Sequence, residues 1–154
     1  MLFSRSCEYA IQAVLYLTVK GDSKTPIHLR AITSDLRIPH HFLSKILQAL
    51  SRNEIITSFR GSKGGFILAR HPSQITLLEV AVAIDGKSFL DRCVLGYAKC
   101  SEEDPCPAHK EWSPVKLMFL SMIEKTTFEK LGKEWNGSYE KLGISSPPFV
   151  RPQY

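Results

Sequence analysis

The stretch that decides the fold is residues 28–69, HLRAITSDLRIPHHFLSKILQALSRNEIITSFRGSKGGFILA. Its first part predicts two short helices within residues 28–52, joined by a tight turn at Arg37 and Ile38. Pro39 follows the turn at the start of the second helix, where its fixed φ is favourable. Apolar residues recur at helical spacing in both helices: Leu29, Ile32 and Leu36, then Leu43, Ile46, Leu47 and Leu50. This pattern is typical of a helix-turn-helix.

The last part of the stretch, residues 55–69, predicts a β-hairpin. Two β-prone runs, IITSF and FILA, flank the sequence RGSKGG, whose glycines indicate a tight turn. Arg60 and Lys63 place two cations at its tip. A hairpin directly after a helix-turn-helix is a winged helix, so we expect a mainly α fold with a small β-hairpin wing. A generic exposed hairpin would explain the glycines but not this order of parts.

The polar side of the second helix predicts contact with DNA. Its residues are spaced i, i+3, i+4 and i+7 and none is acidic: His41, Ser44, Lys45 and Gln48. Such side chains can reach base edges and phosphates in a major groove. The cations Arg60 and Lys63 of the wing suit a phosphate or the minor groove. A plain solvated surface is the alternative for each of these features.

The distribution of charge agrees with a polyanionic partner. The net charge is +5, and within residues 1–75 ten Lys and Arg stand against four Asp and Glu. No apolar run approaches transmembrane length, and the first residues lack a signal-peptide cleavage site. We therefore expect a cytoplasmic protein with no membrane partner. In that compartment the four cysteines favour metal ligands or redox thiols over structural disulfides.

Helices are expected on both sides of the winged helix. Residues 3–20 predict a helix that is apolar around most of its circumference, and burial of so much surface in a short chain suggests a second subunit. Thr76 and Glu79 form a capping-box pattern that opens a helix ending near Gly86.

A long helix is predicted over residues 107–125, with Pro107 in its first turn. Four of its residues repeat as a and d positions of a heptad: Trp112, Val115, Phe119 and Met122. Both a core-facing stripe and a helix–helix interface fit this pattern, and we expect a homodimer. A short helix should follow at 127–135, and the Gly- and Pro-rich tail at 136–154 predicts irregular structure.

Residues 93–109, CVLGYAKCSEEDPCPAH, predict a loop that carries three cysteines and a histidine. Three thiolates with one imidazole or carboxylate can hold a [2Fe–2S] cluster, a [4Fe–4S] cluster or zinc. The spacing lacks the paired C-x2-C of common structural zinc sites, which favours a cluster. The candidate ligands are Cys93, Cys100, Cys106 and His109. A loop with reactive thiols and no metal remains the alternative.

These motifs, in this order over about residues 3–135, resemble the Rrf-type family of bacterial winged-helix transcription regulators. The resemblance rests on Tyr9-Ala10, on L-x-K-I-L at 43–47, on RGSKGGF at 60–66 and on C-x6-C-x5-C-x2-H-x2-W ending at Trp112. In this family the wing usually has Pro and Gly where this chain has Ser62 and Lys63, and cluster-binding members commonly have five residues in the first cysteine gap.

The resemblance implies a homodimer with two-fold symmetry, built by the long helix, that binds a palindromic operator in double-stranded DNA and acts as a repressor. It also implies an iron–sulphur cluster, which aerobic purification can remove. For the fourth ligand the family offers a histidine at the place of His109 or a carboxylate from the partner subunit at the place of Glu8; Cys7 is a third candidate. We favour His109, and with it [2Fe–2S] over [4Fe–4S].

The sequence thus predicts a regulator rather than an enzyme, since it contains no nucleophile motif or phosphate loop. The alternatives are a cluster-free regulator that responds to another ligand and a redox carrier with no DNA role. We expect four parts: a DNA-binding domain at 1–86, a sensor loop at 87–109, dimerisation and following helices at 107–135, and the tail at 136–154.

Overall fold

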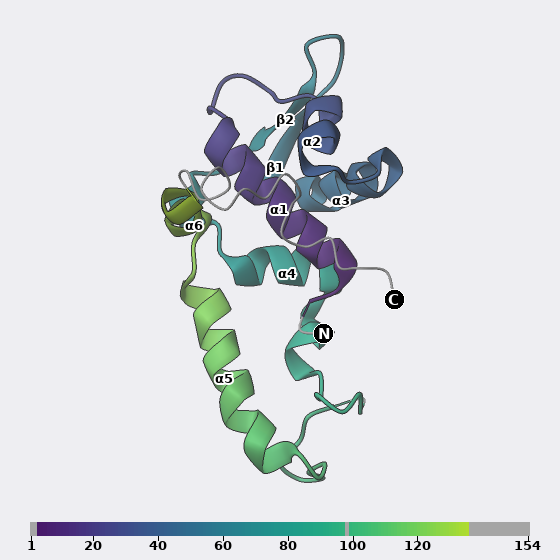
Figure 1. Ribbon diagram of the computed structural model, residues 1–154, viewed down its shortest axis with the longest axis vertical. Coiled ribbons are helices and arrows are strands. Elements are labelled where there is room, and N and C mark those ends of the chain that lie inside the picture. The colour runs from purple at the N-terminus through teal and green to yellow at the C-terminus, as the bar shows by residue number, and fades with distance from the viewer. Residues whose placement is uncertain (1–2, 98, 136–154) are drawn as a thin grey trace.

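The computed structural model describes residues 3–97 and 99–135, so the expected tail at 136–154 lies outside the described residues. The fold is mainly helical with one two-stranded antiparallel hairpin, as predicted (Figure 1). The elements in chain order are α1 (Arg5–Lys20), α2 (Leu29–Leu36), α3 (His40–Arg52), β1 (Ile56–Phe59), β2 (Gly65–Leu68), the 3₁₀ turn η1 (Pro72–Gln74), α4 (Leu77–Asp85), the 3₁₀ turn η2 (Lys87–Asp91), α5 (His109–Lys125) and α6 (Phe128–Trp135). None of the described helices combines the length and hydropathy needed to span a bilayer.

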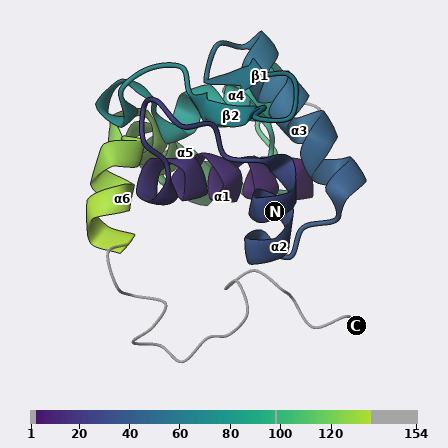
Figure 2. The same cartoon turned by 90° about the horizontal axis from the view of Figure 1, so that it is seen from above.

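Helix α1 runs through the centre of the molecule, with the wing, α3 and α6 arranged around it (Figure 2). Ser4 caps its N-terminus by accepting a hydrogen bond from the backbone N–H of Cys7 at 3.1 Å. Ala10, Ala13 and Val14 are fully buried against elements of the same chain. The expectation that this helix needs a second subunit for its burial is therefore wrong, because α2, α3, α4, α6 and β2 already cover it.

The helix-turn-helix consists of α2 and α3, and the turn between them depends on Arg37, which has a left-handed backbone with φ 53°. Pro39 is the N-cap of α3 rather than its first helical residue, with ψ 134°. The hairpin follows, with Ile56 paired to Leu68 and Phe59 to Gly65.

The wing is anchored to the helical body through Gly65. Ile27 and Phe66 exchange two backbone hydrogen bonds, at 3.0 and 2.9 Å, and form an isolated antiparallel β-bridge beside β2. A Cβ atom at Gly65 would lie 2.5 Å from the carbonyl oxygen of Ile27, and the glycine φ is +154°. Only glycine permits so close an approach, so the second glycine of the GG pair fixes the wing against the segment before α2.

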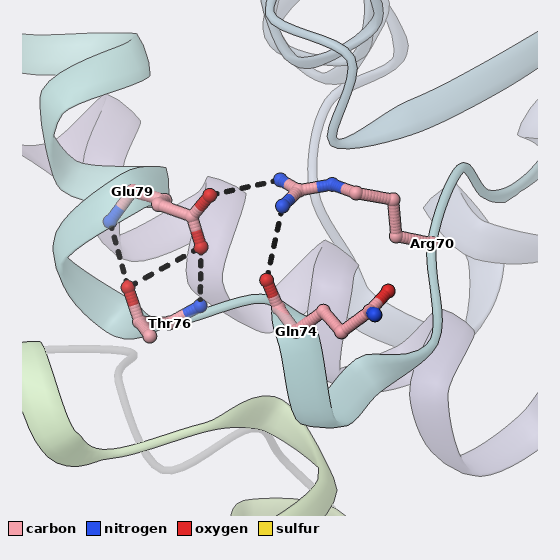
Figure 3. A network of polar contacts seen from close by, with 4 residues as sticks. All are labelled: Arg70, Gln74, Thr76 and Glu79. Carbon is pink, nitrogen blue, oxygen red and sulfur yellow. Dashed lines mark hydrogen bonds and ion pairs between the residues drawn. The ribbon is translucent and has the colours of Figure 1, made fainter.

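The segment after β2 is tied to the start of α4 (Figure 3). Thr76 and Glu79 form the predicted capping box, in which each side chain accepts a hydrogen bond from the other residue's backbone N–H. The other carboxylate oxygen of Glu79 lies 2.9 Å from Nη2 of Arg70, and Nη1 of Arg70 donates to the carbonyl of Gln74 at 3.0 Å. This network joins the base of the wing to α4.

Helix α5 extends away from the body, so that the cysteine loop and the wing tip lie at opposite ends of the long axis (Figure 1). The helix begins at His109 with Ala108 as its N-cap, so the expectation that Pro107 occupies its first turn is wrong. The segment before α1 meets η2 and α5 in an aromatic cluster of Phe3, Phe89 and Phe119, with centroid distances between 5.5 and 6.2 Å. The loop is thus joined to the body through η2 and this cluster.

Candidate functional site

The predicted DNA-reading face lies on the outer side of α3. His41, Lys45 and Gln48 are exposed and Ser44 is partly buried. The opposite side is the core side, where Leu43, Ile46, Leu47 and Leu50 are buried. The helix is therefore amphipathic in the sense that the sequence predicts, and its four polar residues are presented together away from the core.

The wing tip presents the two predicted cations. Arg60 and Lys63 are both exposed, on the turn between β1 and β2. Gly61 has φ +95°, a value that L side chains rarely adopt, which allows the chain to reverse directly after Arg60. The backbone pairing of Ile27 with Phe66 holds this hairpin beside the helix-turn-helix.

Two further residues of α3 belong to this surface and were missed from the sequence. Arg52 is exposed and lies four residues after Gln48, so the same helical spacing would have included it. Phe42 is 50% exposed although it is a large aromatic residue. In the sequence, Phe42 stands outside the apolar pattern of Leu43, Ile46, Leu47 and Leu50. This position could have indicated that its side chain is exposed.

The cysteine loop brings its soft donors together in two pairs. Sγ of Cys93 lies 3.4 Å from Sγ of Cys106, and Sγ of Cys100 lies 3.6 Å from Nδ1 of His109. The backbone N–H of Cys100 donates to the carbonyl of Asp91 at 2.9 Å, which ties the loop to η2. The spacing C-x2-H allows Cys106 and His109 to face one site, and in the structure each of them pairs with a different cysteine.

The two paired thiols differ electrostatically. The backbone N–H of Leu95 lowers the pKa of Cys93, and the hydrogen bond with Cys106 lowers it further. Burial raises the pKa of Cys106, and the same hydrogen bond acts in that direction. Of the two thiols, Cys93 is therefore the one whose surroundings favour the thiolate.

The donor chemistry of this loop fits an iron–sulphur cluster, because three thiols and an imidazole converge on one loop. Among the described residues, however, no group of three or more His, Cys, Asp or Glu side chains is arranged so that it could hold a metal. The structure thus brings the candidate ligands into neighbouring pairs without closing them into one shell.

The alternative fourth ligands have different surroundings. Cys7 is fully buried in the core, and burial raises the pKa of its thiol to about 12. A thiol held in that way is a poor thiolate donor, which argues against Cys7 as a ligand. Glu8 is partly buried on the first turns of α1. It therefore remains the alternative to His109.

The heptad stripe of α5 is divided between two surroundings. Phe119 packs against Phe3 and Phe89 of its own chain, and Trp112 is partly buried with its Nε1 buried and without a hydrogen-bond partner. Val115 and Met122 are 52% and 46% exposed. Met118, which the heptad pattern did not include, is 74% exposed and shares their side of the helix at i+3 from Val115. On this side of α5 the exposed apolar side chains are therefore Val115, Met118 and Met122, while Leu117, which is 65% exposed, lies on another side of the helix.

Comparison with known proteins gives one consistent family. A family model named Rrf2 and described as an iron-dependent transcriptional regulator matches residues 3–134. An HTH-type transcriptional regulator of Aquifex aeolicus is 31% identical over 133 residues, covering 85% of this chain and 91% of the relative. The HTH-type transcriptional regulator IscR of Sodalis glossinidius is 28% identical over 123 residues, covering 80% and 73%.

A solved structure supports the fold. The structure of CymR, the global cysteine regulator of B. subtilis, superimposes with a TM-score of 0.72 at 22% identity, covering 86% of this chain and 96% of that one. At that identity the likeness concerns the arrangement of the elements. The winged-helix fold predicted from the sequence is thereby confirmed.

Proposed function

Since the chain belongs to the Rrf2 family of transcriptional regulators, we propose that it binds a palindromic operator in double-stranded DNA as a homodimer and represses transcription from it. The observation that carries this proposal is the outer side of α3, where His41, Lys45 and Gln48 are exposed together beside a cationic wing. The expectation that the protein is not an enzyme agrees with its relatives, which are transcriptional regulators.

The chemistry of each residue gives it a role in this complex. Helix α3 enters the major groove, where Gln48 and Ser44 can pair with base edges and Lys45 can donate to guanine or to a phosphate. The wing lies over the backbone and the adjacent minor groove. There Arg60 suits a narrow minor groove and Lys63 suits a phosphate.

Retention on DNA tests this proposal. Immobilised duplexes with random sequence should retain the full-length protein at low salt and release it as the salt concentration rises. Changing Lys45, Gln48 and Arg60 together to Ala should weaken retention at every salt concentration. Lys110→Ala removes a cation at the opposite end of the molecule and should have no effect. If the triple variant binds all duplexes as the unchanged protein does, α3 and the wing do not contact DNA.

The dimer is proposed to form through α5. Val115, Met118 and Met122 present three large apolar side chains to solvent on the helix that projects from the body. A second copy of the same helix would bury them, and a two-fold contact places the same residues on both sides. Two reading helices related by this symmetry would bind half-sites separated by a helical turn of DNA or a multiple of it, which is why we expect a palindrome.

For the sensor we propose an iron–sulphur cluster held by Cys93, Cys100, Cys106 and His109, with [2Fe–2S] favoured over [4Fe–4S]. The support is the two close pairs of donors, Cys93 with Cys106 and Cys100 with His109, together with a family described as iron-dependent. When bound, the cluster would supply a redox- and iron-sensitive link across the loop. Asp91 and η2 connect that loop to the aromatic cluster and to α4. A structural change in the loop would therefore reach the helical body through these packed contacts.

The cluster-free alternative uses the same residues. The pair Cys93 and Cys106 would then act as redox thiols, because their sulphur atoms are already 3.4 Å apart. Iron and sulphide analysis of anaerobically purified protein separates the two versions. The family gives no support to the redox-carrier alternative, because its members regulate transcription.

A further inference from the structure

Phe42 is an aromatic residue that the polar reading face does not explain. It is the third residue of α3 and is 50% exposed, while its neighbour Leu43 is fully buried in the core. Its ring packs beside the imidazole of His41, with centroids 4.4 Å apart. Core packing therefore does not account for its position, and a binding partner that covers the ring would remove apolar surface from water.

The place of Phe42 on the helix points to DNA as that partner. It follows His41 directly and lies one turn before Lys45, so it borders the exposed side of α3 near the N-terminal end. In a helix-turn-helix the N-terminal residues of the recognition helix are those that contact base edges in the major groove. Phe42 thus lies in the part of the helix where bases are read.

The major groove offers one apolar group to such a ring. Each base pair exposes donors and acceptors there, and thymine alone adds a C5-methyl group. A phenyl ring has no hydrogen-bonding atom, so it cannot compete for the polar groups of the other bases. We propose that Phe42 selects thymine at one position of each operator half-site through contact with this methyl group. The proposal rests on the proposed function, because it requires α3 to enter the major groove.

Removal of single methyl groups from the DNA tests the contact. The full-length protein first selects its preferred duplex from a pool of random sequence, and each thymine of that duplex is then replaced singly by deoxyuridine. Deoxyuridine keeps the hydrogen-bonding groups of thymine and lacks only the methyl group. At one thymine per half-site the replacement should weaken binding about fourfold, the effect expected for one buried methyl group.

Variants at Phe42 assign that loss to the ring. Phe42→Ala should bind the thymine and deoxyuridine duplexes equally at this position, and Phe42→Leu should keep part of the difference. Phe59→Ala is the matched control: Phe59 is 46% exposed, but it lies on β1 of the wing. Since the methyl group projects only into the major groove, this control should keep the full fourfold difference.

The outcomes distinguish failure of this inference from failure of the proposed function. If the unchanged protein selects and binds a duplex but no thymine shows a methyl effect, Phe42 does not read thymine. The same conclusion follows if Phe42→Ala retains the fourfold difference. If the unchanged protein binds no duplex at all, the DNA-binding proposal fails and this inference fails with it.

Discussion

Sγ of Cys93 and Sγ of Cys106 lie 3.4 Å apart, although 13 positions separate the two residues in the chain. The loop between them therefore folds back so that its ends meet, and Cys100 lies between them in sequence, paired with His109. Thiols gathered in this way are suited to a shared ligand or to reaction with one another.

Each of the three loop cysteines should be needed for iron binding. Changing Cys93, Cys100 or Cys106 to Ala removes one soft donor, so the anaerobically purified variant should lose visible absorbance and iron. Cys7→Ala is the control, because Cys7 is buried in the core and should not affect the iron content. A triple loop variant that keeps the absorbance and iron of the unchanged protein would contradict the cluster assignment.

The fourth ligand should be His109 rather than Glu8. His109→Ala should change the absorbance spectrum and lower the iron content, since Nδ1 of His109 lies 3.6 Å from the sulphur of Cys100. Glu8→Gln keeps the size of the side chain and should leave both measurements unchanged. The reverse result would assign the fourth position to Glu8 of a partner subunit.

The dimer should depend on the exposed apolar side of α5. Met118→Asp places a charge at the centre of the proposed contact and should convert dimers to monomers in light scattering at micromolar concentration. Leu117→Asp is the matched control, because Leu117 is 65% exposed but points to a different side of the helix. Phe119 is unsuitable for this test, since it packs against Phe3 and Phe89 within its own chain. If the Met118→Asp variant keeps the mass of the dimer, this surface is not the dimer interface.

Local patterns made most of the fold predictable. The apolar spacing of 28–52, the glycines of the wing and the capping box of Thr76 all act over a few residues, and the structure contains each element. The boundaries at Pro39 and Pro107 were less accurate: Pro39 is the N-cap of α3, and Pro107 precedes Ala108, the N-cap of α5. The sequence defines the ends of helices only to within one or two residues. The proposed division into domains, sensor loop and dimerisation helix remains a prediction.

Tertiary packing explains what the sequence did not predict. A heptad pattern cannot distinguish a residue that faces its own core from one that faces a second subunit. Phe119 and Met122 thus share one stripe but have different surroundings. Similarly, the spacing of Cys106 and His109 could not predict that each would pair with a more distant cysteine, since loop geometry is set by contacts such as that of Cys100 with Asp91.

The capping box should contribute more to stability than the ion pair beside it. Thr76→Ala removes the acceptor for the backbone N–H of Glu79 and should cost about 1 kcal/mol of the free energy of unfolding. Glu79→Gln keeps an oxygen for the backbone of Thr76 but loses the charge opposite Arg70. Because both ion-pair side chains are more than a third exposed, 37% and 39%, this change should cost less, about 0.5 kcal/mol. Denaturant unfolding of the two variants measures both losses of free energy. A larger loss for Glu79→Gln than for Thr76→Ala would contradict the prediction.

Lys63 and Gln48 should affect DNA binding in different ways. Lys63 lies at the wing tip, where we expect a phosphate contact, so Lys63→Ala should weaken binding equally on every duplex. Because each subunit of the dimer would lose one phosphate contact, the slope of log affinity against log salt should also fall by about 1.8, at about 0.9 for each phosphate. Gln48 lies on the exposed side of α3, so Gln48→Ala should relax preference at one base pair of each half-site, costing about 1–3 kcal/mol per half-site, and leave the slope unchanged. Titrations with the operator, single-base mutants and random duplex at several salt concentrations separate the two effects.

Lys110→Ala is the control for charge. It removes the same charge from the far end of α5 and should change neither the sequence preference nor the slope, so a reduced slope in that variant would show that overall charge, rather than the wing, sets the affinity.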